Sequence, residues 1–478
     1  MCNATRPPYP LWLTLLCGAA AGGMGWGIRG QYGHETGAML AGVLVGFALI
    51  LCAGNHLRLT TSLQAVALLA VGVGFGGSET YGQTIGLTQN HDVIGNTAAW
   101  AWGMLGLFVK GGLWIGIAGA FFGSALGGIR WNIRTICTAM ALMMLAFILG
   151  EIALNTPFDP VHKKLPTLYF SADWHWQPNA VNLKPRPERW GGLLFAWLAL
   201  LSYRGLYLKD ILCLRFGMIG FMAGGVGFAG GQCWQSAHAW YPSRFKAVLG
   251  TTDSLMNWWN MMEITFGTVW GAAFGAAIYR FRKEIRDPSD VIPTSDIPPW
   301  LIYALAGLHL ALLHIWTFFQ FNAFDAIADR ALPMGLIPLV LVVSGGWRGA
   351  ALVALPLTAY PIIARTINTL CIENPTVALV PGLVMFGVIP VMLLFASMPW
   401  SAQMIAHVAL QRGVIVTAVM YFGLNFAFFQ FPWPWLAPTG RTPSALMFAV
   451  DIAILLYAAL RGTSSSKREQ GRERHAVT

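Results

Sequence analysis

The fold class of this chain is decided by residues 10–53, which read PLWLTLLCGAAAGGMGWGIRGQYGHETGAMLAGVLVGFALILCA. Two apolar runs, each as long as the ~20-residue helix that crosses a bilayer, are separated here by a handful of polar residues. The first run leads directly into the second, without the small-residue cleavage site that ends a signal peptide. The stretch therefore predicts two transmembrane helices joined by a short polar hairpin.

The composition of the whole chain agrees with this interpretation. Of its 478 residues 56% are hydrophobic, and only 10% are charged, against roughly 25% in soluble globular proteins. This excludes a soluble enzyme, a disordered chain and a nucleic-acid-binding domain. The net charge of +10 is interpreted as the excess of Lys and Arg that membrane proteins carry in their cytoplasmic loops. We therefore expect membrane lipid, and no nucleic acid, around this chain.

Apolar runs of similar length recur along the sequence and predict an all-α, polytopic bundle of about 12–14 transmembrane helices. The runs near 333 and 349 are short and are joined only by Gly346-Trp347-Arg348, which is why the count has a range. The predicted spans start near residues 10, 37, 63, 98, 134, 190, 211, 258, 299, 333, 349, 376, 413 and 444.

The basic residues predict the orientation. Most of them fall in short connections that share a side with the C-terminal tail, such as residues 129–134 and 280–286. By the positive-inside rule this side is cytoplasmic, so a plasma (inner) membrane protein with both termini in the cytoplasm is expected. The motif-like polar segments and the long loop 155–190 then lie on the outer face.

A glycine-rich motif indicates an internal repeat. Residues 72–77 (GVGFGG) recur as 225–230 (GVGFAG), at an offset of 153 that also carries Lys110 onto Glu263. Both motifs end odd-numbered spans, which predicts a parallel repeat. The alternative is that glycine-rich transmembrane helices resemble one another by composition alone.

On this basis the chain is divided into four units. They are a first repeat unit (1–135), a second repeat unit with the outer loop 155–190 (136–298), a C-terminal transmembrane bundle (299–460), and a disordered, basic cytoplasmic tail (461–478). The spacings Gly119-x3-Gly123-x3-Gly127 and Gly267-x3-Gly271-x3-Gly275 predict close helix packing within these units.

Lys110 and Glu263 lie inside apolar spans, where an unpaired charge costs roughly 2.5–3.5 kcal/mol. Their opposite signs and equivalent repeat positions predict that they pair or share a polar network. Such a pair serves either as a clamp between repeats or in gating and proton or ion coupling, and the sequence leaves both roles open.

Polar residues at the outer ends of the first eight spans form the candidate substrate site. Arg29 suits an anionic group, because its planar guanidinium binds carboxylate or phosphate with two hydrogen bonds. His-acid neighbours are candidates for proton transfer, and amide side chains beside tryptophans suit a sugar-like ligand. Solvated turns and an interfacial aromatic belt are the alternatives. The candidates are Arg29, Gln31, His34, Glu35, Glu79, Gln83, His91, Asp92, Gln232, Gln235 and His238.

These residues predict a secondary transporter or permease for a small polar solute, anionic or sugar-like. The alternative is a membrane-embedded transferase that acts at the outer face on a lipid-linked donor, with His34-Glu35 or His91-Asp92 as general acid and base. Whether the chain is an enzyme is therefore left open. No fixed metal-ligand spacing accompanies the histidines, so neither a metal nor a cofactor is predicted.

Overall fold

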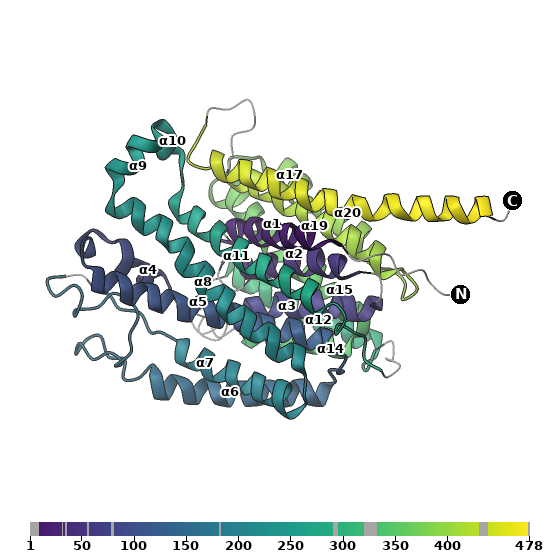
Figure 1. The fold of residues 1–478 in the computed structure, drawn as a ribbon, viewed down its shortest axis with the longest axis horizontal. Coiled ribbons are helices and arrows are strands. Elements are labelled where there is room, and N and C mark those ends of the chain that lie inside the picture. The colour runs from purple at the N-terminus through teal and green to yellow at the C-terminus, as the bar shows by residue number, and fades with distance from the viewer. Residues whose placement is uncertain are drawn as a thin grey trace.

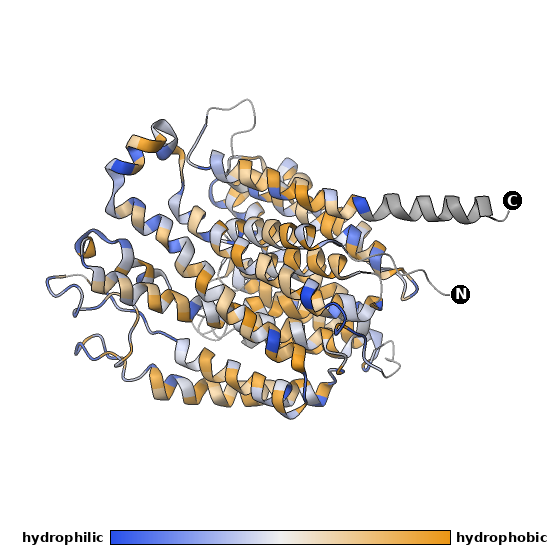
Figure 2. Cartoon of the chain, in the orientation of Figure 1, coloured by the Kyte–Doolittle hydropathy of each residue, from blue (hydrophilic) through white to orange (hydrophobic). Residues whose placement is uncertain are grey.

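The computed structural model describes residues 9–30, 32–33, 36–54, 57–77, 81–180, 183–289, 295–319, 332–429 and 438–476. Within these ranges the chain is helical and contains no strand, so the predicted all-α class is confirmed. Among the described residues, twelve helical segments are long and apolar enough to cross a membrane. Figure 2 shows mainly hydrophobic residues along the helices of the bundle and more hydrophilic residues toward its two ends.

The first part of the chain forms the following helices: α1 (Leu11–Arg29), α2 (Thr36–Ala53), α3 (Leu59–Gly76), α4 (Gly82–Gln89), η1 (His91–Val93), α5 (Thr97–Leu126), α6 (Ile133–Leu154), α7 (Trp190–Leu200), η2 (Leu201–Tyr207), α8 (Ile211–Trp240), α9 (Pro242–Leu249), α10 (Thr251–Leu255) and α11 (Trp258–Phe281). The remainder forms α12 (Pro299–Phe318), α14 (Leu332–Ser344), α15 (Gly346–Leu352), η3 (Val353–Leu357), α16 (Thr358–Ile367), η4 (Asn368–Glu373), α17 (Leu379–Gly382), η5 (Leu383–Val388), α18 (Ile389–Ser397), α19 (Ala406–Phe429) and α20 (Thr442–Ala476).

A helix begins close to each of the fourteen predicted span starts. The two that are not among the twelve long apolar segments are α7 with η2, and α14, whose apolar part is Gly335–Ser344. The last helix, α20, continues to Ala476 and so includes residues that were expected to form a disordered tail.

Both termini lie at the same end of the bundle (Figure 1). The hydroxyl of Tyr9 donates to the carbonyl of Ala458, 3.0 Å away, which places the start of α1 beside the end of the apolar part of α20. We call this the terminal end. The opposite end, the loop end, carries α4, the long loop 155–189 and the α9–α10 excursion.

Acid–base pairs join the connections at the terminal end. Arg58 lies 3.7 Å from Asp287, and Arg130 lies 2.5 Å from Asp296. A deeper pair is fully buried: Nε of Arg204 donates to Oδ2 of Asp210 at 2.9 Å. The guanidinium of Arg204 also bonds the carbonyl of Ser124 and lies 4.2 Å from the Trp131 ring. Arg204 therefore fastens the loop after α5 to the loop before α8.

Glycines set the spacing of the central helices, as the two glycine repeats predicted. A Cβ on Gly119 of α5 would lie 2.1 Å from the carbonyl oxygen of Phe216 in α8. On the other side of the bundle, a Cβ on Gly271 of α11 would lie 2.0 Å from the carbonyl oxygen of Gly18 in α1. Backbones this close tolerate only glycine. The result is a tight core of α1, α3, α5, α8 and α11, with α2 buried along its whole length beside α1 and α3.

Candidate functional site

The candidate site is built around a buried ion pair at the loop end. Arg29, the last residue of α1, places Nη2 3.3 Å from Oε1 of Glu263 in α11. The same nitrogen donates to the hydroxyl of Tyr81 at 2.7 Å. Arg29 is 1% exposed and Glu263 is 4% exposed. A charge pair withdrawn from water is costly, and such pairs inside membrane proteins are usually functional.

The close packing of α1 on α11 positions this pair. Gly18 contacts Gly271, and Gly22, one turn further along α1, contacts Gly267, one turn earlier in α11. The two helices therefore run antiparallel. The C-terminus of α1 is thereby brought beside the N-terminal turns of α11. A cation at a helix C-terminus and an anion in the first turns of a helix are each favoured by the helix dipoles.

Asn260, one turn before Glu263, completes the polar arrangement. Its Nδ2 donates to the carbonyl of Gly27 at 2.7 Å and to Oε2 of Glu263 at 3.1 Å. Its Oδ1 is buried and has no hydrogen-bond partner among the described residues. The carboxylate of Glu263 is thus held by Arg29 on one oxygen and by Asn260 on the other.

Aromatic rings surround the guanidinium of Arg29. Its Cζ lies 4.8 Å from the ring centre of Trp26, 5.4 Å from that of Trp114 and 5.6 Å from that of Tyr81. Each contact lies within the range of a cation–π interaction. Because the rings also exclude water, the attraction between Arg29 and Glu263 acts at a low effective dielectric constant and is stronger than it would be in water.

The predicted pairing of Lys110 with Glu263 is wrong. Nζ of Lys110 lies 2.8 Å from Oε1 of Glu188 and 2.9 Å from Oγ1 of Thr84, whereas Glu263 pairs with Arg29. The physical reason is helix order: α8 packs against both α5 and α11 and lies between them. The glycine motif of α8 that suggested the repeat lets α8 pack closely against both helices.

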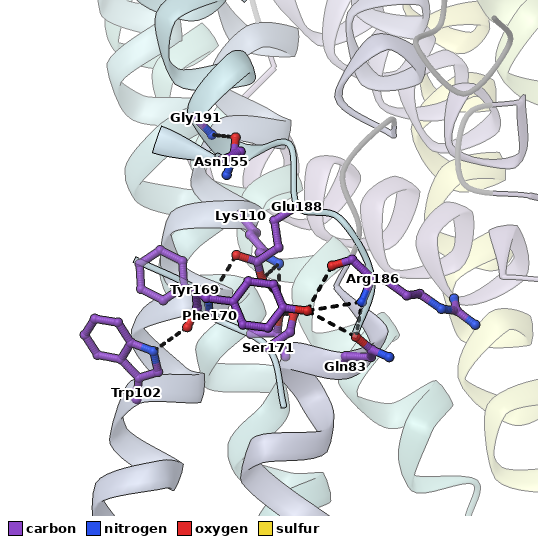
Figure 3. A network of polar contacts seen from close by, with 11 residues as sticks. Gln83, Trp102, Lys110, Asn155, Tyr169, Phe170, Ser171, Arg186, Glu188 and Gly191 are labelled. Carbon is purple, nitrogen blue, oxygen red and sulfur yellow. Dashed lines mark hydrogen bonds and ion pairs between the residues drawn. The ribbon is translucent and has the colours of Figure 1, made fainter. Parts of the chain in front are cut away.

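Lys110 instead anchors the long loop 155–189 (Figure 3). Oε1 of Glu188 also accepts from the hydroxyl of Ser171 at 2.6 Å, and Oε2 accepts from the amide of Phe170 at 3.0 Å. Lys110 is fully buried and Glu188 is 3% exposed. We call Lys110, Thr84, Ser171 and Glu188 the loop clamp, because they tie the middle and the last residues of the loop to α4 and α5.

Gln83 extends this clamp. Its Oε1 accepts from the amide of Arg186 at 2.9 Å, and its Nε2 donates to the carbonyl of Lys184 at 2.5 Å. The hydroxyl of Tyr169 donates to the carbonyl of Arg186 at 2.9 Å (Figure 3). Burial raises the pKa of the Tyr169 phenol above its usual value, so this hydroxyl remains a donor at physiological pH.

A polar groove of about 570 Å³ opens between α4 and the long loop. Gln177 donates to Oδ2 of Asp92 at 3.5 Å. Its own Oε1 is buried and has no hydrogen-bond partner among the described residues, so an acceptor remains for a ligand. The groove is also bordered by the ring of Trp259 at the start of α11, one residue before Asn260. Its other polar side chains include Gln83, Gln89, Asn90 and Lys184.

The remaining predicted residues are distributed around the loop end. His91 lies 3.7 Å from Asp92, and both side chains are largely exposed. Gln232 is fully buried, and its Nε2 donates to Oγ1 of Thr88 at 2.7 Å. Gln235 is buried one turn later on α8. Gln31, His34, Glu35 and Glu79 lie outside the described residues.

His238 has a partner that the sequence did not indicate. Its Nε2 lies 3.2 Å from Oδ1 of Asp253 in α10, and its ring stacks on Trp258 at 4.8 Å. In the described parts of the chain, no three His, Cys, Asp or Glu side chains are grouped as a metal site.

Several residues of these networks were not among the predicted site residues, including Tyr81, Thr84, Ser171, Glu188, Asp253 and Asn260. Tyr81 and Asn260 lie within polar segments near the predicted site, so position within a motif was an available signal. Glu188 and Asp253 lie in connections where carboxylates are usually solvated, and nothing in their local sequence indicates burial or a partner.

The chain was compared with known proteins by sequence and by structure. No protein family matches it, and no curated protein or solved structure gives a match. Its function is therefore argued from the site alone.

Proposed function

We propose that the protein is a secondary transporter or permease for a small polar solute, anionic or sugar-like. The observation that carries this proposal is the buried Arg29–Glu263 pair, enclosed by aromatic rings at the loop end. Burying two charges in a membrane protein is expensive, and it is retained chiefly in substrate and ion pathways. The polar groove beside Trp259 supplies a reception site on the same end of the bundle.

The geometry suggests a mechanism of exchange. An anionic group of the solute replaces the Glu263 carboxylate on Arg29, since both offer oxygen acceptors to one guanidinium. Glu263 then stays held by Asn260 or takes up a proton, which would couple solute movement to proton movement. The glycine contacts between α1 and α11 offer a smooth surface along which the two helices can rock.

A parallel repeat fits this mechanism. In such a repeat α3 corresponds to α8, and α5 corresponds to α11. Both α5 and α11 use regularly spaced glycines to pack against a neighbouring helix, α5 against α8 and α11 against α1. The internal repeat remains part of the proposal, as does the orientation with a cytoplasmic terminal end and an outer loop end in the inner membrane.

The test is solute uptake into proteoliposomes across a panel of carboxylates, phosphates and sugars. Glu263→Gln keeps the shape of the side chain and its bond from Asn260 but removes the charge. Asp210→Asn is the matched control, since it removes the carboxylate from another buried arginine pair at the terminal end. Uptake lost in Glu263→Gln and retained in Asp210→Asn supports the proposal. No uptake of any solute by the wild type contradicts it.

A second candidate is a membrane-embedded transferase acting on a lipid-linked donor. The observation that favours it is the His238–Asp253 pair, which resembles a general base held by a carboxylate. This pair replaces His91-Asp92 as the leading acid–base candidate, because the latter is solvated on the surface. Transfer from a lipid-linked donor that is lost in His238→Gln, with no solute uptake, would favour this candidate.

A further inference from the structure

A second groove lies at the loop end, away from the Arg29–Glu263 pair. It encloses about 550 Å³ and lies among the end of α8, the short helix α9, α11 and α20. Its lining is apolar apart from the exposed Arg244 and Thr265, whose hydroxyl is already bonded to the carbonyl of Met261 at 2.8 Å. The groove therefore suits a hydrocarbon chain and not the polar solute proposed above.

The groove lies where two candidate membrane-spanning helices end, the position at which a membrane would meet water. It is bounded by the last turns of α8 and the first turns of α11, the loop ends of two long apolar segments. Helix α9 connects them through residues 242–249, outside the bundle (Figure 1), and none of its side chains is buried. Val248 of α9 is 83% exposed and Trp234 of α8 is 54% exposed. When apolar side chains as exposed as these lie at a membrane interface, lipid acyl chains that cover them remove apolar surface from water, which is energetically favourable.

The charge on α9 indicates what kind of lipid fits. This helix carries Arg244 and Lys246 and no acidic residue. The nearby carboxylate of Asp253 is held by His238 at 3.2 Å. Arg244 therefore presents a positive charge at the mouth of an apolar groove, which matches the junction between the phosphate and the acyl chain of an anionic phospholipid.

We propose that this groove binds one acyl chain of an anionic phospholipid, with the lipid phosphate on Arg244. The site is independent of the transport proposal, because it shares no residue with the Arg29–Glu263 pair or with the polar groove. A basic side chain near the membrane surface contributes about 1 kcal/mol to binding an anionic lipid. Removing Arg244 should therefore weaken binding about fivefold.

The test is native mass spectrometry of the full chain in detergent, titrated with palmitoyl-oleoyl phosphatidylglycerol or with the matching phosphatidylcholine. Arg244→Gln tests the headgroup contact. Met447→Trp adds bulk to the groove wall from a side chain that is already 41% exposed. Lys163→Gln, in the long outer loop, is the charge-matched control.

The proposal expects wild type and Lys163→Gln to bind phosphatidylglycerol more tightly than phosphatidylcholine. Arg244→Gln should lose that preference, and Met447→Trp should bind both lipids several-fold more weakly at an unchanged melting temperature. Equal phosphatidylglycerol binding by wild type and Arg244→Gln would overturn the headgroup assignment. A wild-type dimer that Met447→Trp dissociates, without loss of lipid, would assign the groove to a second copy of the chain instead.

Discussion

The loop clamp allows a quantitative test of the structure. Lys110→Met removes the ammonium that lies 2.8 Å from Oε1 of Glu188. The Glu188 carboxylate then stays buried, accepting from the hydroxyl of Ser171 and the amide of Phe170 but without a cation beside it (Figure 3). Removing one member of a buried ion pair costs about 3–5 kcal/mol, because the remaining charge is uncompensated. At 1.4 kcal/mol for each factor of ten, the segment around Phe170 should open about two to three and a half orders of magnitude more often.

Hydrogen exchange followed by mass spectrometry measures this opening directly. Peptides covering residues 165–175 and 184–190 should exchange faster in Lys110→Met by the factor given above, while peptides from α1 and α2 stay unchanged. Lys163→Met is the control, since Lys163 is an exposed lysine of the same loop. The double variant Lys110→Met/Glu188→Gln should regain much of the protection, because the neutral side chain carries no buried charge, its amide oxygen can still accept from the amide of Phe170, and its NH2 group can donate to the hydroxyl oxygen of Ser171.

Wild-type exchange rates in both loop peptides of Lys110→Met, or an equal acceleration in the control, would show that the Lys110–Glu188 pair does not hold the loop. The outcome also bears on the polar groove, because Ala172, Gln177 and Lys184 of this loop line it. A loosened loop should weaken solute binding at the groove and leave the Arg29–Glu263 contact in place.

Three further predictions follow from other parts of the structure. Gly271→Ala should lower stability by about 3 kcal/mol or more and so lower the melting temperature, because its Cβ would lie 2.0 Å from a carbonyl oxygen of α1. Gly230→Ala is the control and should be nearly neutral, because a Cβ there meets no atom within 4 Å. Asp210→Asn should lower the melting temperature by removing the charge that pairs with the buried Arg204, at a cost of about 3 kcal/mol, while uptake per folded molecule is retained; unchanged melting would show that the pair is dispensable. Burial raises the pKa of Asp173, so its protonated form favours the folded loop below about pH 3.9, and this contribution is lost as the pH rises through the raised pKa. Asp173→Asn should therefore flatten the pH dependence of exchange in the loop peptides, and identical pH profiles for the two proteins would contradict this assignment.

Part of the site was accessible from the sequence. Arg29 and Glu263 stand out because each is a charged residue within or beside an apolar run. The energetic cost of placing a charge there can be inferred from the neighbouring residues in the sequence. Their partners could not be identified this way. Glu263 was assigned to Lys110 because the two occupy equivalent positions at one offset, but equivalence along the chain carries no information about which helices touch.

The sequence alone determined the helical membrane class, the position of nearly every span and the glycine spacings that pack α5 and α11. These properties are local: hydropathy over about 20 residues, and small residues at intervals of four, suffice to specify them. Only the tertiary structure decided that α8 lies between α5 and α11, so that Lys110 is bonded to Glu188 of the long loop and Glu263 to Arg29. The physical reason is range. An ion pair requires its atoms to lie within about 4 Å, and residues 234 positions apart, such as Arg29 and Glu263, meet only through the packing of whole helices.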